Sequence, residues 1–147
     1  MPLVFAYGPD AYRARVLGRL GSCEVLGPGS LAGYALVFDK PSLRNEAEGF
    51  ANLEKKDGAS VHGVLYDLSR KQIETLEGYF GGYQRSQVKV AARKTGTTVD
   101  ATVFTARRRA RGLRPSAESL DLSLKGAEEN GFPREFIDAL RAFSPLK

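Results

Sequence analysis

The chain has 147 residues, of which 42% are hydrophobic and 27% are charged, and its net charge is +5. These values suit one globular domain with a core of ordinary size, and we expect residues 1–147 to form it. No apolar run is long enough to span a bilayer, and the N-terminal MPLVFAYG lacks the basic and long apolar regions of a signal peptide.

The chain holds one cysteine, Cys23, and one histidine, His62. A single cysteine excludes an intrachain disulfide, and a reducing, cytoplasmic setting is the simplest expectation. One residue of each type also argues against a zinc site of the usual kind, so no metal is expected.

Much of the positive charge lies in ARRRARGLR, residues 106–114. Such a cluster can contact phosphates or a nucleic acid. It has no interleaved aromatic residues and matches no nucleic-acid-binding motif. We therefore interpret it as a solvated loop and expect no nucleic-acid partner, while a role with anionic ligands stays open.

The N-terminal quarter is predicted to hold a strand, a helix and the start of a second strand. Residues 2–7 (PLVFAY) form a short apolar strand that stops at GPD, and Asp10 is expected to cap a helix that continues to about Leu20. After a break at 27–29 (GPG), residues 30–39 form a longer strand.

The next segment is expected to add two strands. A polar loop at 41–49 precedes a strand at 50–54, and a turn at 55–58 separates it from a strand at 61–68, where apolar residues alternate.

Capping and turn residues then mark a helix and a hairpin. Ser69 opens a helix, because Ser69 and Gln72 fit a capping box. Residues 84–94 and 97–106 flank a Thr-Gly turn and are typical of a β-hairpin.

Two helices are predicted at the C-terminal end. Ser116 caps the first, which ends at the Asn-Gly pair 130–131, and PREFIDALRAF (133–143) forms the second, with Pro133 as its first residue. The order of elements indicates an α+β fold, in which a small mixed or antiparallel β-barrel with flanking helices would bury the short strands without open edges.

One carboxylate stands out in the helix that begins at Ser69. Ile73, Leu76 and Phe80 lie on one helical face, and Glu77 points toward the same side. Burial there would raise the pKa of Glu77, which suits a general acid or base. The other interpretation is a boundary glutamate that pairs with an arginine or lies in solvent.

Two glycine-containing turns could form a pocket with this helix. Gly78, Gly81 and Gly82 permit close backbone approach, and Tyr83 follows with a hydroxyl that could hold a ligand. The strand-to-helix turn at Tyr7-Gly8-Pro9-Asp10 could present N–H groups to a carboxylate, although Pro9 has none. Each turn can equally be an ordinary loop.

Taken together, these stretches resemble the gamma-glutamylcyclotransferase family, with its AIG2-like and gamma-glutamylamine cyclotransferase branches. VFAYGPD is similar to the family's FAYGSN, and LAGYALVF and VHGVLYDL are similar to its next two blocks. The segment RPSAESLDLSLKGAEENGFPREFIDALRAF resembles the tail of the branch that acts on gamma-glutamyl amino acids. The resemblance covers nearly the whole chain.

The resemblance implies a small barrel with a pocket between the FAYG turn and the middle helix. It also implies conversion of a gamma-glutamyl compound to 5-oxoproline and a free amine or amino acid. In such enzymes, backbone N–H groups hold the substrate carboxylate, and a glutamate takes a proton from the α-ammonium group and later gives it to the leaving amine. No metal or nucleotide cofactor is needed.

Two departures from the family pattern matter for the site. Pro9 and Asp10 replace Ser-Asn, which removes a donor and adds a charge. The catalytic position falls on Glu77 if the Glu-Gly pair is matched, or on Phe80 if the register runs without gaps from Tyr66.

The first hypothesis is a cyclotransferase-type enzyme acting on a gamma-glutamyl substrate. In it, Glu77 is the acid and base, and the Tyr7-Gly8-Pro9-Asp10 turn and Tyr83 bind the substrate. The alternative is a non-catalytic small-molecule-binding protein in which Phe80 occupies the catalytic position. The sequence leaves the compound and the oligomeric state open.

Overall fold

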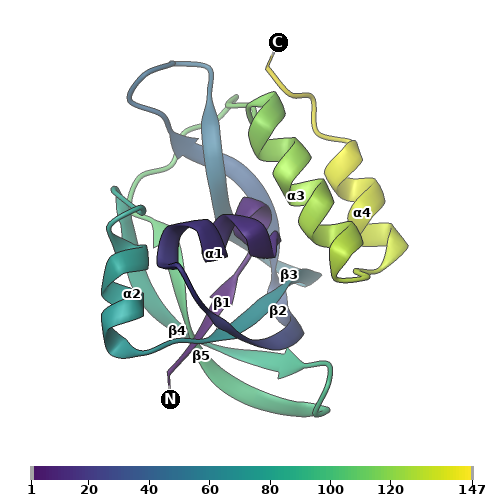
Figure 1. Cartoon of the computed structure of the whole chain (residues 1–147). Helices are drawn as coiled ribbons and strands as arrows, with labels where there is room; N and C mark the ends of the chain where they lie inside the picture. Colours follow the sequence, from purple (N-terminus) through teal and green to yellow (C-terminus); the bar gives the residue numbers. More distant parts are fainter. Residues whose placement is uncertain (1, 147) are drawn as a thin grey trace.

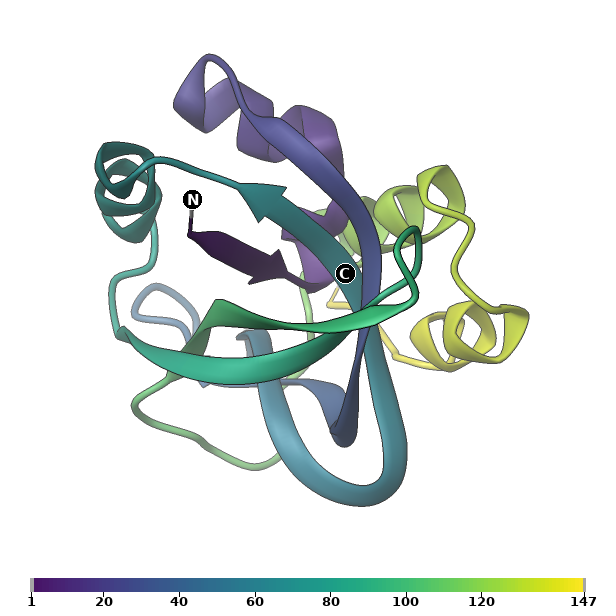
Figure 2. The same ribbon diagram turned by 90° about the horizontal axis from the view of Figure 1, so that it is seen from below.

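The chain folds into a closed five-stranded β-barrel with helices on its outside, in a computed structural model that describes residues 2–146 (Figures 1 and 2). The strands are β1 (Leu3–Ala6), β2 (Glu24–Pro41), β3 (Gly49–Asp67), β4 (Tyr83–Ala92) and β5 (Thr97–Ala106). The helices are the 3-10 turn η1 (Gly8–Ala11), α1 (Arg13–Leu20), α2 (Arg70–Glu77), α3 (Ala117–Glu129) and α4 (Arg134–Arg141). The predicted α+β class and small barrel are confirmed.

The barrel closes through β1, in the strand order β1-β3-β2-β4-β5. β1 pairs antiparallel with β3 and meets β5 in parallel at Val4 and Thr102, so the sheet is mixed. Closure leaves few unpaired edges, and the fully buried residues include Phe5, Leu65 and Val103. The short first strand therefore lies in the core, where it can carry a cavity wall.

Two of the breaks expected from the sequence are wrong. The GPG segment at 27–29 lies inside β2, where the register with β3 shifts between Val25 and Gly27. The turn expected at 55–58 lies inside β3, opposite a second shift between Ala32 and Tyr34. The glycines here form irregularities in long twisted strands instead of ending them.

Most of the predicted caps and turns are confirmed. Ser69 and Gln72 form the capping box of α2, and Ser116 accepts a hydrogen bond from the Ser119 N–H at the start of α3. Strands β4 and β5 form the expected hairpin. Gly131 takes a φ of +61° after α3, while Pro133 is the N-cap of α4 and not its first residue.

Asp10 does not cap α1 as predicted. Gly8, with a φ of +62°, leads the chain from β1 directly into η1, and Asp10 lies inside that turn. α1 begins later, with Tyr12 as an N-cap that makes no side-chain hydrogen bond. The Asp10 side chain is thereby free to take part in the site described below.

Helix α3 holds η1 in place through a backbone contact. A Cβ at Gly126 would lie 2.7 Å from both the Ala11 carbonyl carbon and the Tyr12 nitrogen, so only glycine permits this approach. The Asn130 side chain also donates to the Ala11 carbonyl at 3.0 Å. α3 and α4 lie side by side on this flank, as Figure 1 shows.

The C-terminal helices dock on the barrel through aromatic contacts. The His62 ring lies 5.1 Å from that of Phe136 and 5.9 Å from that of Phe132. Arg93, directly after β4, donates to the carbonyls of Asn130 and Gly131. His62 is thus a packing residue on the flank that holds α3.

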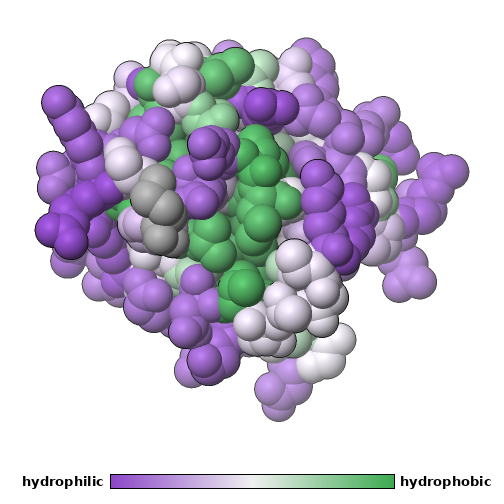
Figure 3. Space-filling view, turned by 60° about the horizontal axis from the view of Figure 1, so that its bottom comes forward, coloured by the Kyte–Doolittle hydropathy of each residue, from purple (hydrophilic) through white to green (hydrophobic). Residues whose placement is uncertain are grey.

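Three of the clustered arginines bind the protein itself. Arg107 donates to the Tyr83 carbonyl, Arg109 pairs with Asp39 at 2.7 Å, and Arg114 donates to the carbonyl of Ser144. On the face drawn in Figure 3, apolar atoms form a band bordered by hydrophilic residues. Within residues 2–146, no helix is long and apolar enough to cross a membrane.

Candidate functional site

A cavity of about 340 Å³ opens beside η1. Its walls come from β1, η1, α1, the turn after α2, strands β3 to β5 and the start of α3. Ligand-binding cavities begin at roughly 300 Å³, so this one suits a ligand of one or two amino acids in size.

One wall of the cavity is aromatic. The rings of Phe80 and Phe104 are stacked, with centroids 4.7 Å apart and planes inclined by 6°, and Tyr83 meets Phe80 edge-on at 5.2 Å. The Tyr83 hydroxyl donates to the Ala51 carbonyl at 2.6 Å, and the Tyr7 hydroxyl donates to the Phe104 carbonyl. Burial raises the pKa of both tyrosines, so both stay neutral. Each hydroxyl proton is already used in a hydrogen bond to a strand carbonyl.

A buried carboxylate lies on another wall. Asp10 is 8% exposed, and its Oδ1 accepts from Arg15 Nε at 3.0 Å and from Arg19 Nη1 at 3.2 Å. Burial raises the pKa of Asp10, while Arg19 and Arg15 offset part of that rise. The Arg19 guanidinium also lies 4.6 Å from the centroid of the exposed Tyr79 ring, which ties α1 to the turn after α2.

Polar groups of this cluster remain available to a ligand. No residue from 2 to 146 donates a hydrogen bond to Asp10 Oδ2. This oxygen is not fully enclosed by the protein, so a ligand can reach it. Arg15 and Arg19 each use one N–H on Asp10, and both line the cavity. The cluster therefore offers one acceptor and several donors, with a net charge of +1.

The η1 backbone offers fewer donors than the sequence predicted. The Asp10 N–H donates to the Tyr7 carbonyl at 3.3 Å, and Pro9 has no N–H. Tyr7, Pro9 and Asp10 all line the cavity, as expected for this turn, and Gly8 supplies its bend. Anion recognition on this side rests on arginine side chains more than on a backbone nest.

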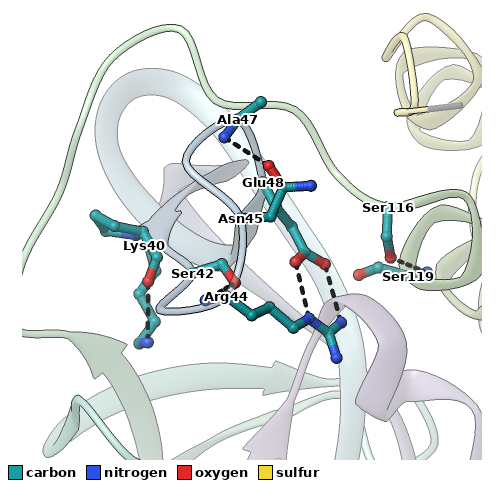
Figure 4. Close-up of polar contacts among 9 residues, drawn as sticks. Lys40, Ser42, Arg44, Asn45, Ala47, Glu48, Ser116 and Ser119 are labelled. Carbon is teal, nitrogen blue, oxygen red and sulfur yellow. Dashed lines mark hydrogen bonds and ion pairs between the residues drawn. The ribbon is translucent and has the colours of Figure 1, made fainter.

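The mouth of the cavity lies near the loop 42–48 and the start of α3. Arg44 lines the mouth and forks onto the buried Glu48 carboxylate, with N–O distances of 3.2 and 3.3 Å (Figure 4). Ser116 and Ser119 line it from the α3 side. Lys40 lies 5.2 Å from the Phe50 ring centroid. This rim is polar, whereas the wall around Phe80 is aromatic.

Comparison with known proteins places this fold in a family. The sequence model of the AIG2-like family matches residues 60–140, which is more than half of the chain. The chain belongs to the AIG2-like family. The match contains α2, the turn after it and most of the tail that packs on η1.

The chain is also similar to proteins that are named gamma-glutamylcyclotransferases. It is 26% identical to a gamma-glutamylcyclotransferase of Homo sapiens and 25% identical to that of Bos taurus, in each case over 97% of this chain and 79% of the relative. A solved structure of a gamma-glutamyl cyclotransferase superposes with a TM-score of 0.88 at 25% identity, covering 99% of this chain and 89% of that one. An AIG2-like protein of Mus musculus shares the fold with a TM-score of 0.56 at 20% identity, over 76% and 80% of the two chains.

Of the two environments considered for Glu77, the structure shows the exposed, arginine-paired one and not the buried one. Its side chain is 43% exposed, and its two oxygens accept from Arg85 Nη2 and Nε at 2.7 and 2.8 Å. These hydrogen bonds hold the pKa of Glu77 below its usual value, where burial was expected to raise it. The reason is that α2 buries Ile73 and Leu76, while Glu77 lies on the flank that faces β4. This is the boundary glutamate of the other interpretation.

Of the two residues considered for the catalytic position, Phe80 lines the cavity and Glu77 does not. The sequence reasoning overlooked Arg15 and Arg19, which the structure brings to Asp10. Their spacing of four places both on one face of α1, next to the turn that holds the acid. That spacing was the available signal.

Proposed function

We propose that this chain binds a small molecule of the gamma-glutamyl type in the cavity, and that the turn after α2 contributes an aromatic contact, as in the alternative hypothesis, instead of a proton acceptor. The observation that carries this proposal is the position of Phe80, which lines the cavity and stacks on Phe104, while the Glu77 carboxylate is paired with Arg85 outside it. Phenylalanine has no proton to transfer.

The charge of the Asp10 cluster supports recognition of a ligand carboxylate. The negative charge that Asp10 adds to the turn would by itself repel such a group. Two arginines bound to Asp10 Oδ1 reverse the local charge, and their free N–H groups match a carboxylate. A gamma-glutamyl compound carries this carboxylate together with an ammonium group that Asp10 Oδ2 can accept from.

Thermal unfolding with a panel of gamma-glutamyl amino acids and amines tests this proposal. A compound that binds the folded state raises the unfolding midpoint with its concentration. We expect such a rise for the parent chain and for Glu77→Gln, because Glu77 lies outside the cavity. No rise with any compound would overturn the proposal.

The Asp10 Oδ2 atom favours a second candidate function, which is cyclotransferase turnover with Asp10 in place of the glutamate. Asp10 would take a proton from the α-ammonium group. The amine would then attack the γ-carbonyl carbon, the bond to the leaving nitrogen would break, and that nitrogen would receive the proton. Release of 5-oxoproline by the parent chain and by Glu77→Gln, but not by Asp10→Asn, is the result expected for this candidate. Binding without product favours the first proposal.

The cytoplasmic location and the single-domain organisation expected from the sequence also stay predictions. Both agree with the proposed function, since free gamma-glutamyl compounds can reach a cavity of this size from solution.

A further inference from the structure

The Asp10 cluster presents two unlike groups to the same cavity. Asp10 Oδ2 is a carboxylate oxygen that receives no hydrogen bond from residues 2–146, on a side chain that is 11% exposed and lines the cavity. Because this oxygen keeps accessible surface and Asp10 lines the cavity, a ligand donor can reach it there. An ionised amine is the strongest such donor, because both partners are then charged.

The arginines beside Asp10 select the opposite charge. Arg15 Nε and Arg19 Nη1 are held on Asp10 Oδ1, which fixes both guanidinium groups, and within residues 2–146 their other N–H groups make no hydrogen bond to the protein. Planar guanidinium groups recognise carboxylates through paired hydrogen bonds. An ammonium and a carboxylate on one carbon, as in an α-amino acid, would satisfy the acceptor and the donors of this cluster together.

The aromatic wall of the same cavity favours an apolar, flat group. Phe80 and Phe104 form a stacked pair, and Tyr83 packs against Phe80 with its hydroxyl proton committed to Ala51. An aromatic ring on the ligand gains from such stacked and edge-on contacts beyond the area that it buries. A second anionic group on the ligand is not favoured, because Arg44 at the mouth is forked onto Glu48.

We infer that the preferred ligand is an α-amino acid with an aromatic side chain, whose ammonium group binds Asp10 Oδ2, whose carboxylate binds Arg15 and Arg19, and whose ring packs on Phe80. This inference rests on the proposed function, in that the cavity binds a small molecule, and it names the chemical class that the cavity prefers. A gamma-glutamyl compound shares the charged end but lacks a ring of its own beside that end.

Calorimetric titration with four compounds separates the three contacts. L-phenylalanine has all three groups, 3-phenylpropionate lacks the ammonium group, 2-phenylethylamine lacks the carboxylate, and L-alanine lacks the ring. We expect L-phenylalanine to bind at least about tenfold more tightly than each of the others, since a hydrogen bond to a charged group contributes about 1.5–3 kcal/mol. Equal affinity for L-phenylalanine and any one of the three would overturn the inference.

Matched variants assign the contacts to residues. Asp10→Asn is expected to remove the preference for L-phenylalanine over 3-phenylpropionate, and Phe80→Leu to reduce the preference over L-alanine by about threefold or more. Glu77→Gln, at the end of α2 and outside the cavity, should change neither preference. If gamma-glutamyl compounds bind and L-phenylalanine does not, this inference fails and the proposed function stands. If no compound of either panel binds, the proposed function fails as well.

Discussion

The ring of Phe80 stacks on that of Phe104, with centroids 4.7 Å apart and planes inclined by 6°. This contact joins the turn after α2 to strand β5 and places an aromatic ring in the cavity. The neighbouring acid, Glu77, is held outside by Arg85. Of the two residues that the family resemblance left open, the one that lines the cavity is therefore Phe80, and Glu77 lies outside it.

The Phe80 contact should contribute to stability as well as to the cavity. Phe80→Ala removes a partly buried ring and its stack, and we expect a loss of about 1–3 kcal/mol in the free energy of unfolding. Leu43→Ala serves as the control, because Leu43 is fully exposed and its removal should change the free energy by less than about 0.5 kcal/mol. Urea denaturation of both variants provides the measurement. Equal stabilities would show that the stack is not formed in solution.

Because Gly126 contacts η1 closely, an alanine substitution there should change stability in the opposite direction from one at Gly18. Gly126→Ala would place a Cβ 2.7 Å from backbone atoms of Ala11 and Tyr12, and should lower the free energy of unfolding by about 1–3 kcal/mol and weaken ligand binding. Gly18→Ala in α1 meets no atom within 4 Å and should stabilise the protein by up to about 1 kcal/mol. Thermal unfolding distinguishes the two. A tolerated alanine at position 126 would mean that α3 does not fix η1.

Asp10→Asn is expected to leave the fold intact. Burial raises the folded-state pKa of Asp10 above its unfolded value, so the folded protein holds this proton more tightly and the ionised form at neutral pH carries a penalty. Asparagine keeps the shape without the charge, and Arg15 and Arg19 keep some contact with water. The unfolding midpoint at pH 7 should match or exceed that of the parent chain. A fall of many degrees would mean that the ion pairs outweigh the cost of burial.

His62 predicts a pH dependence of stability. Burial, with a smaller effect of Arg93, lowers the pKa of His62 below 6.5 in the folded state. The unfolded chain therefore binds the proton first, and stability should fall as the pH drops below about 6.5. His62→Leu should remove part of this fall between pH 7 and pH 5. Chemical denaturation at both pH values measures the free energy of unfolding. An equal loss of free energy from pH 7 to pH 5 in the parent chain and in His62→Leu would contradict the role given to His62.

The sequence predicted the elements better than it predicted the site. Caps such as Ser69 and Ser116 act on the nearest residues, so local pattern was enough to find their helices. The register shift at Gly27 depends on the partner strand, so the same glycine looked like a break.

The site depended on contacts that local pattern does not encode. Periodicity placed Glu77 near the apolar face of α2. Its exposure depends on Arg85, which lies on β4 and reaches Glu77 only in the folded chain. The pairing of Asp10 with Arg15 and Arg19 needed the 3-10 turn, which the sequence suggested only as a cap.

We expect ligand recognition in this cavity to depend on Asp10 and not on Glu77. The decisive experiment is a calorimetric titration of one bound compound with an α-amino-acid head group into the parent chain, Asp10→Asn and Glu77→Gln. We predict that Asp10→Asn weakens binding at least about tenfold while Glu77→Gln binds as the parent does. Unchanged binding by Asp10→Asn together with lost binding by Glu77→Gln would contradict the claim.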